Sequence, residues 1–308
     1  MELEFVNWLA QQFSNQPNLL LGIGDDAAVL ENLGAENLVV TVDTLADGAH
    51  FDLSRQPAEL IGRKAVAVNL SDLAAMGAEP VAVVVGIVLP TAGGAEIAKR
   101  LYAGMRPLLS EFNIALAGGD TNSWNGPLTI SVTALGKAPP DQIWRRSGAR
   151  AGDNLIVTGD LGGSILGKHL SFQPRLRESR LLAASHKIHA AIDISDGLLL
   201  DLHRLTSASA CGAELIFEQI PISDAARKLA ATDDSESTPL DHALSDGEDF
   251  ELLMAVSPST WQAIQSDNTI DFQLTKIGNI IADAGIFQRL ADGSRVELAP
   301  KGFEHKFD

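Results

Sequence analysis

The chain alternates short apolar runs, rich in β-branched residues, with longer amphipathic stretches, a pattern typical of an α/β fold. Two stretches of the first half predict helices. One begins after Pro57, a residue suited to a first helical turn, and ends near Gly77, which suits a C-cap. The other covers Ala95–Phe112, where Pro107 marks a kink or a break. Strands are predicted at Leu38–Val42, Val81–Leu89, Ile114–Ala117 and Leu128–Leu135.

A turn-rich stretch, residues 137–153, interrupts this pattern and is the best candidate for a domain junction. The alternation then restarts, so we predict two domains, residues 1–138 and residues 139–308, the second of mixed α/β type. Its expected elements are a Gly-rich turn at Gly159–Gly167, a helix from about Gly197 to Ala210, and strands at Asn154–Thr158, Ala190–Ile194, Ala213–Phe217, Phe250–Val256, Phe272–Ile280 and Ile286–Leu290.

Length and composition agree with two domains. The chain has 308 residues and 45% hydrophobic content, enough for a substantial core. The lone Cys211 cannot form an intramolecular disulfide, nor build a zinc or iron–sulfur site by itself. A cytoplasmic protein fits this composition best.

Neither export nor membrane insertion is indicated. The opening Met1–Trp8 mixes acids into a short amphipathic helix, unlike a signal peptide, and the apolar run Val81–Leu89 is far below the ~20 residues of a membrane span. The formal charge of −17, from 40 acidic and 23 basic residues, argues against nucleic acid or an anionic membrane as a partner. The polar stretch Asp233–Pro239 is predicted to be an exposed loop.

Five short acidic segments stand where apolar runs end. Carboxylates at the ends of buried elements are costly to desolvate unless a cation collects them. Taken singly, each segment could be an ordinary turn, but together they favour a metal site. The segments are Gly22–Asp26, Thr41–Asp43, Asn69–Asp72, Gly118–Asp120 and Asp193–Asp196.

Strand geometry adds detail to the second segment. Side chains alternate faces along a strand, so Thr41 and Asp43 aim a hydroxyl and a carboxylate the same way. Val40 and Val42 are then expected to be apolar anchors behind them.

The last segment follows the same rule, which places Asp193 and Ser195 on one face. Asp72 is different, because it lies in the last turns of a predicted helix, where the backbone dipole disfavours negative charge. Either it serves a site, or it is an exposed helix acid or a partner of Arg63 or Lys64.

Oxygen-only ligands suit a hard cation, and Mg²⁺ typically takes one or two carboxylates together with water and substrate phosphates. An EF-hand would need all its ligands in one short loop, a spacing that these segments lack. Several Mg²⁺ ions would also let an acidic pocket hold a polyanionic nucleotide.

A second motif, Gly162–His169, is one residue short of a P-loop and follows a predicted strand. His169 stands where a P-loop has the Ser or Thr that binds Mg²⁺. The alternative, which we favour, is a Gly-rich turn leading into a helix with Lys168 on its surface.

Three histidines are also candidates for chemistry. His50 lies just beyond Asp43 and is either a substrate contact or a structural residue. His186 and His189 are three apart without cysteine partners, and we expect them to be solvated.

Seven motifs occur in a fixed order: Gly22–Val29, Asp43–Phe51, Asn69–Pro80, Gly118–Thr121, Arg146–Ala149, Asp193–Leu198 and Gly247–Leu252. In this order, from about residue 20 to residue 303, they closely resemble the thiamine-monophosphate kinase family. The agreement in order is far more specific than any one motif.

The resemblance implies an enzyme that uses ATP and Mg²⁺ to convert thiamine monophosphate to thiamine diphosphate, in a superfamily that resembles aminoimidazole ribonucleotide synthetase. It implies a two-domain α/β chain in which residues 1–138 bind ATP and metal. That domain would contribute strands to a β-barrel shared in a homodimer, with the nucleotide at the edge of the barrel.

The resemblance also implies roles for individual residues. Asp25 is expected to be structural. The family's metal ligands fall on Asp26, Thr41, Val42, Asp43, Asp72, Asp120, Asp193 and Asp196. Its nucleotide contacts fall on Tyr102, Gly119, Asp120, Arg146 and Ser195, and its substrate contacts on His50, Glu248 and Phe303.

Two positions depart from the family pattern. Val42 stands where a Thr commonly precedes the Asp, which removes a hydroxyl ligand but leaves a backbone carbonyl. Phe303 stands where Tyr or Trp is common, and it can still stack on a thiamine ring without offering a polar handle.

The acceptor implied by the resemblance is a phosphate monoester, whose second pKa near ~6 makes it largely dianionic at neutral pH. No covalent nucleophile or essential base is therefore expected, and positioning by Mg²⁺ for in-line attack should dominate.

Three alternatives can be weighed against this expectation. Selenophosphate synthetase relies on an N-terminal Cys or selenocysteine, whereas the first cysteine here is Cys211, and the hydrogenase-maturation relative ends in a reactive Cys that this chain lacks. A non-catalytic acidic metal-binding protein would explain the carboxylates but not their Gly and Ser/Thr neighbours.

Overall fold

The computed structural model describes residues 19–21, 25–30, 35–232 and 237–304. The amphipathic helix predicted at Met1–Trp8, the glycines Gly22 and Gly24, and residues 233–236 of the predicted acidic loop lie outside these ranges. None of the described helices is long and apolar enough to cross a membrane.

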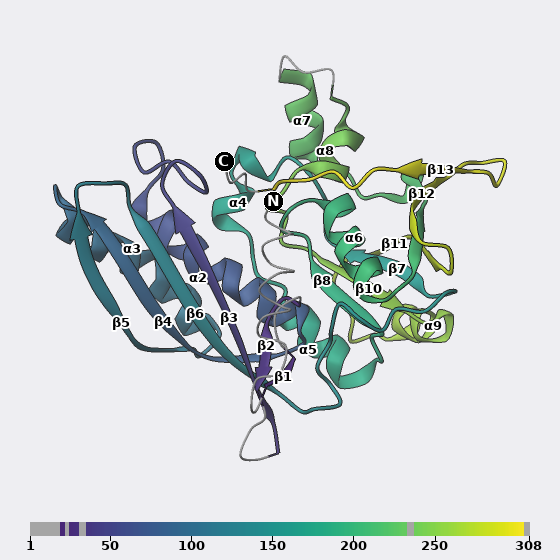
Figure 1. Cartoon of the computed structure of the whole chain (residues 1–308), viewed down its shortest axis with the longest axis horizontal. Helices are drawn as coiled ribbons and strands as arrows, with labels where there is room; N and C mark the ends of the chain where they lie inside the picture. The colour runs from purple at the N-terminus through teal and green to yellow at the C-terminus, as the bar shows by residue number, and fades with distance from the viewer. Residues whose placement is uncertain (1–18, 22–24, 31–34, 233–236, 305–308) are drawn as a thin grey trace.

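The first half of the chain forms a six-stranded sheet whose one face is covered by two helices (Figure 1). The strand order is β1-β2-β3-β6-β4-β5, with β4 and β5 parallel and the other neighbours antiparallel. Every strand predicted in this half is present, and all four end later than predicted. The bounds are β1 Leu19–Leu21, β2 Ala28–Leu30, β3 Asn37–Ala46, β4 Glu79–Pro90, β5 Ala115–Trp124 and β6 Thr129–Ala138.

The two helices are α2 (Ala58–Ala75) and α3 (Gly94–Glu111), close to the predicted bounds. Helix α3 continues through Pro107, which is exposed near the C-terminal end. A proline there removes one backbone hydrogen bond without ending the helix.

One expectation for β3 is wrong. Val39, Thr41 and Leu45 are buried, whereas Val42 is 59% exposed, so the valine face is not an apolar anchor. The helices cover the face that carries Thr41 and Asp43, and the face that carries Val42 stays open within the chain.

The second half forms a seven-stranded sheet in the order β13-β12-β9-β11-β7-β10-β8, with helices around it (Figure 1). Its predicted strands and its predicted helix are confirmed. The strands are β7 Asn154–Thr158, β8 Ala190–Asp193, β9 Gly212–Leu215, β10 Leu252–Val256, β11 Leu274–Ile281, β12 Gly285–Arg289 and β13 Arg295–Leu298. The helices are α4 Lys168–Ser171, α5 Leu176–Ser185, α6 Leu198–Ala208, α7 Asp224–Thr232, α8 Pro239–Ser245 and α9 Pro258–Ser266, with short 3₁₀ helices η1 Ser164–Leu166 and η2 Phe217–Gln219.

Helix α2 joins the two halves. It is buried almost all round, and one apolar core includes its Val66 and Leu70 together with Ile156, Phe250 and Met254 of the second half. Apolar burial is the main driving force for such packing. Side chains on α2 are therefore held at the boundary between the halves.

The described residues of this single chain form no closed barrel, since both sheets are open in their strand order. Strand β5 is an edge strand of the first sheet, and all ten of its residues are exposed. An edge strand of this length offers unpaired backbone groups to a partner.

Candidate functional site

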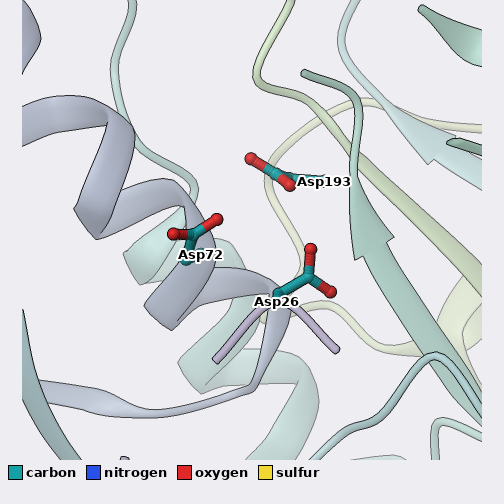
Figure 2. A group of neighbouring side chains, drawn as sticks. All are labelled: Asp26, Asp72 and Asp193. Carbon is teal, nitrogen blue, oxygen red and sulfur yellow. The ribbon is translucent and has the colours of Figure 1, made fainter. Parts of the chain in front are cut away.

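Three carboxylates converge at the boundary between the halves. Oxygen atoms of Asp26, Asp72 and Asp193 lie within 4.8 Å of one another (Figure 2). Asp26 comes just before β2, Asp72 from the last turn of α2, and Asp193 from the end of β8. The site therefore draws on segments far apart in the sequence, which meet because α2 packs against both sheets.

Hydroxyl groups next to the acids hold two of these carboxylates in place. Thr41 Oγ1 donates to Asp72 Oδ2 at 2.5 Å, and Ser71 Oγ donates to Asp193 Oδ2 at 2.5 Å. Asn69, which belongs to the same segment of α2 as Ser71 and Asp72, accepts from the backbone N–H of Asp43 through Oδ1 at 3.1 Å. Polar residues of two acidic segments thus fix the cluster.

The cluster is electrostatically unfavourable without a cation. Burial raises the pKa of Asp43 to about 6, and the neighbouring acids Asp196 and Asp26 add to the shift. Burial, followed by repulsion from Asp43 and Asp193, raises the pKa of Asp72 well above its usual range. Burial and the charge of Asp26 do the same to Asp193.

Carboxylates whose charged forms are disfavoured in this way are stabilised by a bound divalent cation. The donor set consists of oxygen atoms alone and fits Mg²⁺. Asp72 is thus a member of the cluster, and its other reading, as an exposed acid or a partner of Arg63 or Lys64, is wrong.

Two arginines lie beside the acids. Arg146 donates from Nη2 to Asp26 Oδ1 at 2.8 Å and from Nε to Oδ2 at 3.1 Å. Its backbone N–H donates to Asp25, which agrees with the structural role expected for that acid. Arg204 Nη1 donates to Asp196 at 2.6 Å, so this predicted metal ligand already has a cationic partner.

A cavity of about 680 Å³ adjoins the cluster. It brings together many of the predicted residues: Asp43, Asp72, Asp193 and Asp196, the nucleotide candidate Ser195, and the three substrate candidates His50, Glu248 and Phe303. Apolar side chains of Ile165 and Leu229 line it as well. One cavity therefore carries both an acidic wall and surface suited to an organic ring.

Some predicted residues lie elsewhere. Asp120 is exposed on β5, beside Gly86 of β4, and does not join the cluster within one chain. A Cβ at Gly119 would lie 2.0 Å from the Val85 carbonyl oxygen, so this glycine is required for strand packing. Tyr102 lines a separate hollow on α3.

The Gly162–His169 segment is a turn whose amides are already occupied. Gly162 N–H donates to Asp249 at 2.8 Å, and Gly163 N–H donates to Asp246 at 2.9 Å. A P-loop presents such amides to phosphate, so these bonds favour the Gly-rich turn. The Lys168 side chain is 33% exposed, in agreement with the predicted surface position, and its Nζ also donates to the buried Glu251 at 2.8 Å.

The expectation of two solvated histidines is wrong. The side chains of His186 and His189 are 8% and 10% exposed, and each bonds an aspartate at 2.8 Å, Asp267 and Asp153 respectively. Packing between distant segments buries them, which local polarity does not reveal.

Two supporting residues were missed by the sequence patterns. Asp201 accepts from the backbone N–H groups of Ser195 and Asp196 and so fixes that loop. Lys64 is fully buried in α2 and bonds Glu248. The available signal was a lysine in the middle of an otherwise apolar helix.

The fold and the acid-lined cavity define a class, and the comparisons agree. Residues 24–138 match the AIR synthase related protein N-terminal domain, and residues 147–287 match the corresponding C-terminal domain. The chain is 42% identical to a thiamine-monophosphate kinase of Rhodopirellula baltica over 99% of this chain and 97% of that one. It is 34% identical to the enzyme of Escherichia coli K12, with 95% and 94% covered. The chain belongs to the thiamine-monophosphate kinase family.

Solved structures agree with this assignment. AaThiL complexed with AMPPCP and TMP has a TM-score of 0.85 at 26% identity, covering 99% of this chain and 97% of that chain. Thiamine-monophosphate kinase from Stenotrophomonas maltophilia has a TM-score of 0.76 at 35% identity, with 94% and 96% covered. The hydrogenase maturation protein HypE of E. coli, at 22% identity and a TM-score of 0.72 over 98% of this chain and 99% of that one, shares the fold.

Proposed function

We propose that this protein transfers the γ-phosphoryl group of ATP to thiamine monophosphate and so forms thiamine diphosphate. The observation that carries the proposal is the convergence of Asp26, Asp72 and Asp193 beside the cavity that holds Glu248 and Phe303. A polyanionic donor and a phosphorylated acceptor need cations between them, and an acidic cluster supplies the place for those cations.

Asp26, Asp43, Asp72 and Asp193 would hold Mg²⁺, with Thr41, Asp196 and the Val42 carbonyl as further ligands carried over from the family. When bound, Mg²⁺ neutralises the negative charge that accumulates as the two phosphates approach. Thr41 and Ser71 orient the carboxylates through their hydroxyl hydrogen bonds. Arg146 and Ser195 contact the nucleotide.

The chemical step needs little from a side chain. A phosphate oxygen of thiamine monophosphate attacks the γ-phosphorus, and the bond from that phosphorus to the β–γ bridging oxygen breaks as ADP leaves. Because the acceptor is largely dianionic at neutral pH, no side chain has to remove a proton. We propose direct in-line transfer, without a covalent enzyme intermediate.

The acceptor's organic part is placed by the rest of the cavity. Phe303 is 49% exposed there and offers an aromatic face to a heteroaromatic ring. Glu248 adds a carboxylate whose charge complements the positive thiazolium ring, and His50 lines the same space. The protein is proposed to act in the cytoplasm, where ATP is available.

The functional test follows thiamine diphosphate formation from ATP and thiamine monophosphate. We expect product with MgCl₂, loss of product on adding EDTA in excess, and recovery when Mg²⁺ is restored. A folded, metal-loaded protein that forms no product would exclude the kinase. Mg²⁺ binding without nucleotide binding, measured by calorimetry, would instead support the acidic metal-binding protein.

We also propose a homodimer built on the open face of the first sheet. This face exposes Val42, Val81 and Val84 at 39% to 59%, an apolar patch unusual for a free surface. Among the described residues, the part of β3 beyond Val40 pairs only with β6, so its other edge has no neighbouring strand, although Asn69 accepts from the Asp43 N–H. Pairing of that edge with β5 of a second copy would close a barrel and bury the patch.

Val84→Glu should therefore convert the dimer to a monomer, because it places a charge in the buried centre of the barrel. Light scattering coupled to size exclusion should give 32.6 kDa for the variant and twice that mass for the wild type. Val296→Glu, which is also exposed but lies on β13, is the matched control and should remain dimeric. A monomeric wild type would contradict the barrel.

A further inference from the structure

Lys64 is a fully buried cation that joins two of the residues lining the cavity, His50 and Glu248, both of them predicted contacts of the acceptor. Its side chain is 0% exposed within α2, and Nζ donates to the backbone oxygen of His50 at 2.7 Å and to Glu248 Oε1 at 2.5 Å. His50 belongs to the first half and Glu248 to the second. One ammonium group thus ties together both sides of the cavity.

Helix geometry places Lys64 directly behind the site. Lys64, Val68 and Asp72 are spaced four apart, so they lie along the same face of α2. Val68 and Asp72 line the cavity. Because Asp72 belongs to the acidic cluster, one face of α2 carries a residue of the proposed metal site. Two turns earlier, the same face carries Lys64, which contacts His50 and Glu248.

The segment that Lys64 holds has an unusual backbone. Glu248 adopts φ 65° and Phe250 φ 52°, in the left-handed region that side chains other than glycine rarely occupy. Glu248 N–H donates to the Ser195 carbonyl at 2.7 Å, and Phe250 N–H to that of Ile194 at 2.8 Å. Such conformations persist where surrounding contacts over-determine them, typically at functional sites.

Packing alone does not explain a lysine at this position. The neighbouring residues of α2, Ala65 and Val66, are fully buried and apolar. A buried ammonium is costly, and burial lowers the pKa of Lys64 while Glu248 acts to restore it. An apolar residue of similar length would fill the space without that cost, so the charge itself has a use.

We propose that Lys64 is a positioning residue for the acceptor: it fixes the His50 backbone and the Glu248 carboxylate before substrate binds. The Glu248 side chain is 28% exposed and lines the cavity, so its carboxylate faces Lys64 and the acceptor space together. The role in acceptor binding rests on the proposed kinase function. The role does not extend to ATP binding, since neither His50 nor Glu248 is among the predicted nucleotide contacts.

The test compares Lys64→Met, which keeps the length and removes the charge, with the wild type in steady-state kinetics. We expect KM for thiamine monophosphate to rise about tenfold or more, with KM for ATP and kcat within about twofold. Lys168→Met is the matched control, because Lys168 pairs with Glu251 of the same segment away from the cavity. Its two KM values should stay near those of the wild type.

A second variant separates positioning from stability. Lys64→Met/Glu248→Gln leaves no unpaired charge, so it should recover any loss in Tm of the single variant while KM for the acceptor stays high. Equal changes in both KM values, or an acceptor KM restored in the double variant, would overturn the proposal.

Hydrogen exchange on the ligand-free protein gives a readout that needs no kinase activity. Lys64→Met should lose protection at the amides of Glu248 and Phe250, whereas Lys168→Met should keep it. If the wild type proves inactive, this loss still supports the positioning role while the kinase function fails. Unchanged protection would overturn the role of Lys64 whatever the enzyme's activity.

Discussion

Asp72→Asn will lower kcat by about a thousandfold or more and will leave the metal-free protein at least as stable as the wild type. Asn keeps the shape of Asp and can still accept from Thr41 Oγ1, so the fold loses no hydrogen bond. What disappears is one carboxylate of the group formed with Asp26 and Asp193. That carboxylate is repelled by its neighbours when no cation is present, and it would be a ligand when one is bound.

The sign of the pH dependence follows from the raised pKa values. The folded metal-free protein holds protons on Asp43 and Asp72 that the unfolded chain releases near pH 4. Stability contributed by these groups is present at low pH and is lost as pH rises through the folded pKa, about 6 for Asp43. The advantage of Asp72→Asn over the wild type should therefore grow from pH 4 upward, and Mg²⁺ should reduce it.

The measurements are Tm at several pH values, with EDTA or with MgCl₂, alongside kcat. Asp271→Asn is the control, since Asp271 is an exposed acid paired with Arg177 and lies far along the chain from the cluster. It should leave kcat and its metal response unchanged. Near-normal turnover in Asp72→Asn, or a Tm that falls sharply without metal, would remove Asp72 from the proposed metal site.

The fold was largely predictable, because its strands are short apolar runs that stand out against their neighbours. Elements were missed where that contrast is weak, as in the three-residue strand Ala28–Leu30 and the exposed strand Arg295–Leu298. The strand at Ile114 was predicted to end at Ala117, with the acidic segment Gly118–Asp120 after it. In the structure the strand continues to Trp124, since Gly119 lets it approach Val85 closely.

The site was predictable where residues and their neighbours form one motif. Asp72, Ser71 and Asn69 come from a single segment, and all three serve the acidic cluster or β3. Lys64 was not predictable as a site residue, because its partner Glu248 is 184 positions away. Partners brought together only by tertiary packing leave no local pattern to read.

Asp120 poses the remaining question, because strand register separates it from the cluster. Asp43 lies opposite Val132, Val132 opposite Val85, and Val85 opposite Gly119. Three strand spacings of ~4.8 Å put Asp43 and Gly119 roughly 14 Å apart. Asp120 follows Gly119 and so points to the other, open face of the sheet. Within one chain the two aspartates cannot share an ion.

A closed dimeric barrel would resolve this separation. If β5 of a second copy pairs with the edge of β3 beyond Val40 that has no neighbouring strand, the partner's Gly119–Asp120 region approaches Asp43. Asp43 lies on the helix-covered face and Asp120 on the open face, so Asp120 would serve the other subunit's site by holding a cation or nucleotide that bridges the two faces at the rim of the barrel. Each active site would need Asp43 from one chain and Asp120 from its partner.

Mixing two inactive variants tests this arrangement. Asp43→Asn and Asp120→Asn dimers should each be inactive, whereas their refolded equimolar mixture should recover about a quarter of wild-type activity. Half of the dimers would be mixed, and each mixed dimer would hold one intact site and one with both defects. Asp43→Asn mixed with Asp72→Asn is the matched control, because both ligands come from one chain and every mixed dimer has two defective sites. Equal recovery in both mixtures, or none in the first, would show that Asp120 does not act across the dimer.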